Sequence, residues 1–428
     1  MNLPDVIKIR PLTVPVHGDL NFKSLCPGSK SLTNRSLILA ALARGKTQLR
    51  GALCSEDTEL MVNCLKKLGF HVEARADPSN ACNRLITVHG QGGKIPAGEA
   101  DLFVGTAGTV ARFVTALCAR GKGCYRLHGT PRMHDRPMKE LFDAIRSLGG
   151  SVKDRNGHLP AVVSGPLRSG RVLIFGEDSS QFASALWLVS RISKTERIEV
   201  ECEFSPYVEM TKALLKDWEN PAKVREIEFD ASSAGYFLAL HYLHRKDEKR
   251  RPPGMKGLLK NSCQVDRLME DYWPLREEIS RKKDLGDTVL TYVIMAAARK
   301  CPLRLVDAAN LREQECDRIS AMAAELNKCG VPARELPDGL ILSPATNFKR
   351  ATIHTYNDHR IAMCFAVLAT VDAMGDGKPW ITIENPSCVE KTFPNFFKTL
   401  EDVARRSHQK AGQPFSPVVL TLDGKPVF

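Results

Sequence analysis

Residues 26–42 read CPGSKSLTNRSLILAAL and show the local pattern on which the fold prediction rests. A Pro-Gly-Ser turn at Pro27–Ser29 precedes an apolar run, Leu32–Leu42, whose spacing predicts a helix. A helix that begins at such a turn offers backbone N–H groups and a positive dipole end to an anion. Lys30 would add an ammonium group, and Arg35 a planar guanidinium suited to a carboxylate. The glycine-to-glycine-lysine spacing of a P-loop is absent, and an ordinary helix cap with a surface lysine stays open as the alternative.

Apolar strands and amphipathic helices alternate along the rest of the chain. The predicted strands are Leu85–Val88 and Leu102–Val104, and the predicted helices are Glu59–Leu68, Thr109–Leu117, Met138–Leu148, Ala231–Leu243, Val289–Arg299, Cys316–Asn327 and Asp358–Val371. These strand-and-helix units recur without a residue-level period, which predicts an α/β fold of several similar units. The charged stretch Arg245–Gly257 contains two prolines and predicts an exposed loop.

The composition is that of a globular protein with room for two or three domains. The chain has 428 residues, of which 43% are hydrophobic and 26% charged, and a net charge of +12. The basic residues are spread along the chain, and no aromatic residues interleave with the densest basic run, Arg245–Arg251, as a base-stacking surface requires. The charge therefore favours small anionic substrates over nucleic acid.

The sequence predicts a cytoplasmic protein without membrane segments or metal. Met1–Arg10 lacks the apolar core of a signal peptide, and the apolar stretch Val289–Ala298 is too short to span a bilayer. The thirteen cysteines are scattered and odd in number, which is typical of free thiols. Their spacing also argues against a zinc site.

Six further motifs place small, hydroxyl-bearing or basic residues at a turn or a helix start. They are Gly105–Arg112 (GTAGTVAR), Thr130–Pro137 (TPRMHDRP), Asp178–Phe182 (DSSQF), Asn310–Arg318 (NLREQECDR), Tyr356–Arg360 (YNDHR) and Glu390–Pro394 (EKTFP). Each motif alone has a purely structural interpretation. Together with the acids Asp287 and Glu315, they predict one basic cleft that holds two small, multiply anionic substrates.

From about Gly18 to Phe397, the order of these motifs closely resembles that of the 5-enolpyruvylshikimate-3-phosphate synthase family. The resemblance implies transfer of the enolpyruvyl group of phosphoenolpyruvate to the 5-hydroxyl of shikimate 3-phosphate, with no metal or organic cofactor. It also implies a monomer with the two-domain enolpyruvyl transferase fold, an α/β fold in which repeated βαβαββ units build each domain. The expected domains are residues 1–19 plus 230–428 and residues 20–229, with the active site in the cleft between them.

The resemblance assigns roles to individual residues of this chain. The implied catalytic residues are Lys30, Asp287, Glu315 and His359. Ser31 and Arg35 would contact the shikimate carboxylate, while Ser179 and Ser180 would contact the 3-phosphate. The implied basic shell around phosphoenolpyruvate consists of Lys30, Arg132, Arg318, Arg360 and Lys391. The other implied substrate-binding residues are Gly108, Thr109, Arg112, Gln181, Tyr207, Asn310 and Gln314.

The chain departs from the family pattern on the acceptor side. Gln314 stands where the family has a lysine, Phe204 where it has a serine, and Thr106 where asparagine is common. Losing one cation and one hydroxyl weakens a phosphate site by about 2–5 kcal/mol. The chain is also shortened between Met210 and Asp230 and between Cys263 and Asp287, where strands of two repeated units are expected to be missing.

Three functions follow from this pattern. The main hypothesis is an ordinary shikimate-pathway synthase of aromatic amino acid biosynthesis. The second is a paralogue that acts on a different cyclic polyol, with or without a phosphate group, as a transferase or lyase of specialised metabolism. The third is a binding protein without catalysis, against which the intact Lys30, Asp287, Glu315, His359 and Lys391 argue.

Overall fold

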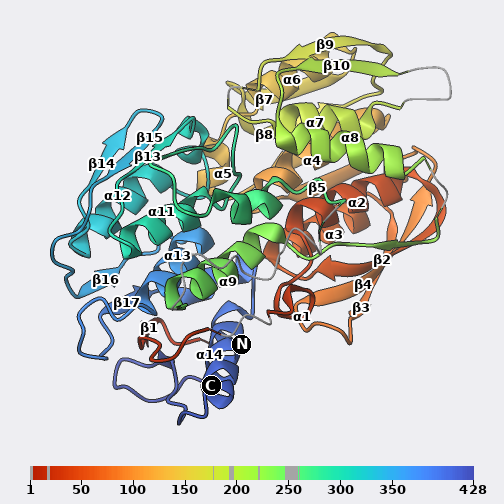
Figure 1. The fold of residues 1–428 in the computed structure, drawn as a ribbon. Coiled ribbons are helices and arrows are strands. Elements are labelled where there is room, and N and C mark those ends of the chain that lie inside the picture. The colour runs from red at the N-terminus through yellow and green to blue at the C-terminus, as the bar shows by residue number, and fades with distance from the viewer. Residues whose placement is uncertain are drawn as a thin grey trace. The chain divides into compact units, whose positions relative to one another are not determined.

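The computed structural model describes residues 3–16, 20–176, 178–191, 197–219, 222–245, 259 and 261–428. The chain forms two compact units (Figure 1): unit 1 comprises Met1–Cys26 and Phe229–Phe428, and unit 2 comprises Pro27–Glu228. The chain thus leaves unit 1 after Cys26 and returns to it at Phe229, whereas the family resemblance places these crossings near residues 19/20 and 229/230.

Among its described residues, unit 2 contains two four-stranded sheets and one two-stranded sheet. The first has the order β11-β2-β4-β3, with strands Val224–Glu226, Arg44–Leu53, Asn83–Gln91 and His71–Ala76. The second has the order β5-β6-β8-β7, with strands Glu99–Phe103, Cys124–His128, His158–Ser164 and Ser151–Arg155. The third pairs β9 (Gly170–Ile174) with β10 (Ile198–Cys202).

Unit 1 contains two four-stranded sheets in the part of the chain that the structure describes. One has the order β12-β13-β15-β14, with strands Glu278–Ser280, Leu303–Val306, Gly339–Leu342 and Ala333–Leu336. The other has the order β16-β17-β1-β18, with strands Ala351–Ile353, Ile381–Glu384, Val6–Ile9 and Val419–Leu420. Strand β1 pairs with β17 on one side and β18 on the other, so the start of the chain is built into unit 1.

All four of these larger sheets share one pattern of strand directions. In each sheet order the first strand is parallel to the second, and the next two pairings are antiparallel. In β5-β6-β8-β7, β5 is parallel to β6, while β6 with β8 and β8 with β7 are antiparallel pairs. The two-stranded sheet has the parallel pair alone. The described chain between Met210 and Asp230 supplies one strand, β11, which pairs with β2 of a different sheet. Between Cys263 and Asp287 lie the 3-10 helix η1 (Val265–Tyr272) and β12. Near the first predicted shortening, the described residues show a sheet with only the parallel pair β9-β10. The second shortening stays a prediction, because β12 belongs to a complete four-stranded sheet.

Helices connect the strands and fill the interior of each unit. In unit 2 they are α2 (Lys30–Leu42), α3 (Glu56–Lys67), α4 (Gly108–Arg120), α5 (Pro131–Asp135), α6 (Lys139–Ser147), α7 (Gln181–Val189) and α8 (Pro206–Asp217). In unit 1 they are α1 (Phe22–Leu25), α9 (Ala231–His244), α11 (Val289–Ala298), η2 (Ala309–Leu311), α12 (Arg318–Lys328), α13 (His359–Ala369), η3 (Pro386–Lys391) and α14 (Phe396–Lys410).

Three helices pack together at the centre of each unit. Helices α2, α4 and α7 contact one another in unit 2, and α9, α11 and α13 do so in unit 1 (Figure 1). These helices are buried on nearly every side, and all eleven residues of α13 are buried. A helix that is apolar all round requires such an interior position. The starts of these six helices are therefore held by the two cores.

The predicted helices exist: those at Ala231 and Val289 begin at the predicted residue, and the others begin one to three residues away. Helix α2 begins at Lys30 rather than Leu32, because the Ser29 side chain accepts from Leu32 N and caps the turn. The start predicted at Cys316 is wrong: α12 begins at Arg318, because Asp317 accepts from the backbone N–H groups of Ile319 and Ser320. The loop predicted at Arg245–Gly257 lies, apart from Arg245, outside the described residues. None of the helices among the described residues is long and apolar enough to cross a membrane.

Candidate active site

The central helices of both units begin at motifs of the sequence analysis. In unit 2, α2, α4 and α7 begin at Lys30, Gly108 and Gln181, and in unit 1, α13 begins at His359. Helix α11 begins two residues after Asp287. Each helix start presents N–H groups and a positive dipole end, so anionic groups are favoured at these points.

The turn before α2 is fixed by close backbone packing. A Cβ atom on Gly28 would lie 1.8 Å from the Gly51 carbonyl oxygen, so only glycine fits there. Gly28 N donates to Asn83 Oδ1 at 2.8 Å, and Ser29 N donates to the Glu228 carbonyl. At the first position of α2, the Lys30 ammonium lies 3.1 Å from the buried carboxylate of Asp57. The turn thus holds one ion pair at the start of the helix.

Arg35 is a buried cation whose partners are all uncharged. Its Nε donates to Thr211 Oγ1 at 2.7 Å, and its terminal nitrogens donate to the carbonyls of Ser31 and Tyr207 and to Ser184 Oγ. No carboxylate among the described residues forms an ion pair with it, and burial lowers the pKa of Arg35 to about 10. A buried guanidinium without a counter-ion is suited to an anionic ligand.

Two buried arginines converge on the start of α4. A Cβ atom on Gly108 would lie 2.2 Å from Arg112 Nη1 and 2.8 Å from Arg136 Nη2, so glycine leaves room for both. Arg112 Nη1 donates to Gln181 Oε1 at 3.2 Å, which joins α4 to the start of α7. Arg136 Nη1 donates to the Thr106 carbonyl at 3.2 Å. Thr109, the second residue of α4, follows Gly108 directly in the chain.

The hydroxyl and tyrosine candidates of unit 2 lie at the starts of α7 and α8. Ser179 Oγ accepts from Gln181 N at 3.2 Å, and Ser180 directly precedes α7. Tyr207 is the second residue of α8, and its carbonyl accepts from Arg35. Arg132 belongs to the short helix α5. Phe204, between β10 and α8, exposes 69% of its surface.

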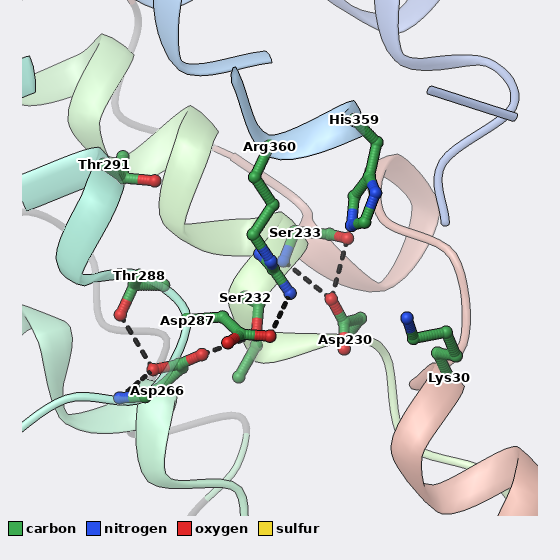
Figure 2. Close-up of polar contacts among 12 residues, drawn as sticks. Lys30, Asp230, Ser232, Ser233, Asp266, Asp287, Thr288, Thr291, His359 and Arg360 are labelled. Carbon is green, nitrogen blue, oxygen red and sulfur yellow. Dashed lines mark hydrogen bonds and ion pairs between the residues drawn. The ribbon is translucent and has the colours of Figure 1, made fainter. Parts of the chain in front are cut away.

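In unit 1, Asp287 is held between two arginines. Arg360 Nη2 donates to Asp287 Oδ2 at 2.6 Å, and Arg281 Nη2 donates to Asp287 Oδ1 at 3.2 Å. Figure 2 shows Arg360 reaching Asp287 from the start of α13. Burial acts to lower the pKa of Arg360, but Asp287 and other nearby acids hold the pKa well above its ordinary value. The salt bridge therefore carries a charged arginine.

Two further carboxylates, the partly buried Asp230 and the buried Asp266, support this pair. Asp266 Oδ1 accepts from Gly286 N at 2.7 Å and from Thr288 Oγ1 at 2.8 Å, which fixes the residues on either side of Asp287 (Figure 2). Asp230 caps α9 through Ser233 N at 2.8 Å, and burial raises the pKa of Asp230. Neither acid was assigned a role from the sequence.

A second cluster in unit 1 surrounds Glu315. Arg318 Nη2 donates to Glu315 Oε2 at 2.8 Å, and Lys391 Nζ lies 3.9 Å from Glu315 Oε1. Arg318 Nε also donates to Asp358 Oδ2 at 2.7 Å, where the carboxylate is fully buried. Burial opposes the charge of Arg318, but the carboxylates outweigh it and raise its pKa. Glu315 is thus an acid between two cations.

The remaining predicted residues of unit 1 border these clusters. The buried His359 ring has Nδ1 3.9 Å from Asp358 Oδ1. Gln314 Nε2 donates to the Asn310 carbonyl at 3.1 Å, so the amide that replaces the family's lysine binds its own loop.

The structure joins the predicted residues into sets within each unit. Arg35 meets Tyr207, Arg112 meets Gln181, Asp287 meets Arg360, and Glu315 meets Arg318 and Lys391. Residues that the sequence reasoning left without a role are Asp57, Arg136, Thr211, Asp230, Asp266, Arg281 and Asp358. Asp358 and Arg136 lie inside the motifs Tyr356–Arg360 and Thr130–Pro137, so the sequence could have indicated them. Thr211 and Arg281 lie outside every motif, and no sequence pattern indicates them.

Comparisons with known proteins identify the family of this chain. The family model described as EPSP synthase (3-phosphoshikimate 1-carboxyvinyltransferase) matches residues 15–248 and 265–400. A 3-phosphoshikimate 1-carboxyvinyltransferase from Opitutus terrae is 38% identical, over 95% of this chain and 99% of that protein. One from Marinomonas sp. is 34% identical, over 88% of this chain and 96% of that protein.

The same relationship holds for the fold. A solved structure of EPSP synthase from Acinetobacter baumannii superposes with a TM-score of 0.65 and 20% identity, and covers 97% of this chain and 99% of that chain. At 20% identity, the structural similarity supports the fold alone, while the family model and the curated relatives support common descent. The chain belongs to the EPSP synthase family.

Proposed function

We propose that this protein transfers the enolpyruvyl group of phosphoenolpyruvate to the 5-hydroxyl of shikimate 3-phosphate and releases phosphate. The proposal is supported by the family and by relatives that are named 3-phosphoshikimate 1-carboxyvinyltransferase over nearly the whole chain. It requires residues that bind two anions and residues that move protons.

The observation that carries the proposal is the pair of cation-held carboxylates in unit 1. Asp287 contacts Arg360 and Arg281, and Glu315 contacts Arg318 and Lys391. Cations at these positions can bind an anionic substrate, while the carboxylates beside them can accept or return a proton. Binding and proton transfer are thus available within one set of side chains.

Each step of the reaction requires a proton transfer or a bound anion that these groups can provide. The 5-hydroxyl oxygen bonds to C2 of phosphoenolpyruvate and loses its proton, while C3 gains a proton, which forms a tetrahedral ketal phosphate. The bond from C2 to the phosphate oxygen then breaks, and the new methyl group gives back a proton. Asp287 and Glu315 are the two carboxylates for these transfers, and Lys30 and His359 complete the catalytic set. Lys30, Arg132, Arg318, Arg360 and Lys391 bind phosphoenolpyruvate.

Unit 2 provides groups for the acceptor. Arg35, whose partners are neutral, and Ser31 bind the shikimate carboxylate, and Ser179 and Ser180 bind the 3-phosphate. Gly108, Thr109, Arg112, Gln181 and Tyr207 shape the surrounding site. In unit 1, Asn310 and Gln314 contact the acceptor, although Gln314 offers an amide in place of a cation.

Phosphate release from phosphoenolpyruvate tests the proposal directly. Purified protein is assayed with shikimate 3-phosphate, with unphosphorylated shikimate and without an acceptor. Turnover with shikimate 3-phosphate alone is the expected result. Release with shikimate, or without an acceptor, would contradict it and favour a paralogue with a different acceptor or a lyase.

Three related expectations stay predictions of the family resemblance. They are a monomeric state, a cytoplasmic location and catalysis without a metal or organic cofactor. Sedimentation velocity checks the first and fractionation of the source cells the second. For the third, activity is expected to persist after exhaustive dialysis against a chelator, and a loss that added metal restores would contradict it.

A further inference from the structure

A cluster of metal-binding side chains lies on the β3–β4 hairpin of unit 2, apart from the residues assigned to the reaction. One ligand atom from each of His71, Glu73 and His89 lies within 4.8 Å of the others. His71 and His89 are directly opposite in the antiparallel register, and Glu73 is two residues along β3. Because side chains alternate between the faces of a strand, all three lie on one face of the sheet.

The contacts within the cluster already bring the donors together. His71 Nε2 lies 2.9 Å from Glu73 Oε1, and the two imidazole rings pack edge to face with centroids 4.7 Å apart. His89 Nε2 is buried and has no hydrogen-bond partner among the described residues. A buried ring nitrogen without a partner is costly, and coordination would satisfy it.

The surrounding charges limit the affinity and the choice of ion. Arg75 Nη2 lies 3.4 Å from Glu73 Oε2, and Lys46 of β2 is paired in register with His89. These two cations repel a divalent ion and so lower its affinity for the site. With a single carboxylate among the three donors, the site is poorly suited to calcium or magnesium. Two imidazoles and one carboxylate suit zinc, copper or nickel.

We propose that His71, Glu73 and His89 bind one divalent transition-metal ion, zinc in the first instance, which joins the edge strand β3 to β4. Water completes a tetrahedral site. Donor atoms at the usual zinc distances lie about 3.4 Å apart, so the ring nitrogens and the Glu73 oxygen must move closer. His71, 63% exposed at its side chain, and Glu73, 39% exposed, have the freedom to do so.

This site departs from the metal-free protein that the cysteine spacing predicted, and it is separate from the proposed catalysis. No residue assigned to substrates lies on β3 or β4. Removal of the metal is therefore expected to leave kcat unchanged, and failure of either proposal leaves the other intact.

The test is a titration of the chelator-treated protein with cobalt(II) and zinc(II), followed by absorption and calorimetry. Wild type is compared with His71→Ala, His89→Ala and Glu73→Gln. The matched control is His354→Ala, because His354 Nδ1 lies 3.1 Å from Glu384 Oε2 without a second imidazole in that pair. Cobalt spectra separate this site from the thirteen cysteine thiols, since thiolate ligands give an intense charge-transfer band.

We expect one equivalent of metal in wild type and in His354→Ala, without a thiolate band. Either histidine variant should bind about 100-fold more weakly, and zinc should raise the unfolding temperature of wild type but not of these variants. The His71→Ala and Glu73→Gln variants should unfold at the wild-type temperature when a chelator is present, because His71 and Glu73 are surface groups. Equal binding by wild type and the histidine variants, or a thiolate band, would overturn the proposal.

Discussion

The buried arginines of the two units differ in their partners. Arg35 of unit 2 contacts only neutral groups, and burial lowers its pKa to about 10. Arg318 of unit 1 contacts the carboxylates of Glu315 and Asp358, which raise its pKa above the ordinary value. Unit 2 thus holds a cation that an anionic ligand can satisfy, whereas unit 1 holds acids that are positioned by cations. Among the described residues, the same residue type is left without a counter-ion in one unit and is paired with carboxylates in the other.

The largest expected effect comes from removing a carboxylate in unit 1. Asp287→Asn keeps the shape but cannot accept a proton, so kcat should fall by about 100- to 10,000-fold while KM for phosphoenolpyruvate changes little. The measurement is steady-state phosphate release. The control is Glu335→Gln, which removes a carboxylate beside Arg312 in the same unit and should leave kcat unchanged. A normal kcat for Asp287→Asn would remove this residue from proton transfer.

Exchanging each arginine for methionine tests the contrast in stability. Arg318→Met leaves the fully buried Asp358 without its cation and should lower the free energy of unfolding by about 3–5 kcal/mol. Arg35→Met removes a desolvated cation along with its hydrogen bonds, so a change of about 1 kcal/mol or less is expected. Urea denaturation measures both, and Arg35→Met should instead raise KM for the acceptor. Equal destabilisation by the two variants would break the contrast.

His244 tests whether the neighbouring groups of a buried residue, rather than the unit in which it lies, determine the direction of its pKa shift. It lies in unit 1, yet burial and the nearby Arg299 lower its pKa to about 4, while its ring accepts from or donates to Thr370 Oγ1 at 2.9 Å. The unfolded chain binds a proton near pH 6.5, so stability is lost as pH falls from about 6.5 towards 4. The loss should reach about 3 kcal/mol. His244→Gln should flatten this dependence in denaturation curves at several pH values, and an unchanged slope would contradict the prediction.

The smallest effect concerns the acceptor side of unit 1. Gln314→Lys restores the cation that the family pattern has, so KM for shikimate 3-phosphate should fall by about tenfold, with KM for phosphoenolpyruvate unchanged. Its matched control is Gln314→Met, which removes the hydrogen bond to the Asn310 carbonyl without adding charge. A lower KM in both variants would show that the loop, rather than the charge, controls binding.

Local sequence predicted much of this protein. The turn at Pro27–Ser29 and the acids Asp317 and Asp358 cap the helices that follow them, because a cap needs only residues a few positions away. The predicted helix start at Cys316 was wrong because it ignored the local cap: Asp317 caps the helix, which therefore begins at Arg318. The order of the motifs was enough to indicate the family and the list of candidate residues.

Tertiary structure alone decided which residues meet. Arg35 finds Thr211 and Tyr207, and Arg318 finds Asp358, across distances in the chain that no helix or strand pattern spans. His71 and His89 become neighbours only through the register of β3 and β4. Sequence determines turns, caps and apolar periodicity because these depend on adjacent residues. The counter-ion of a buried charge depends on how the core packs, and only the folded chain decides that.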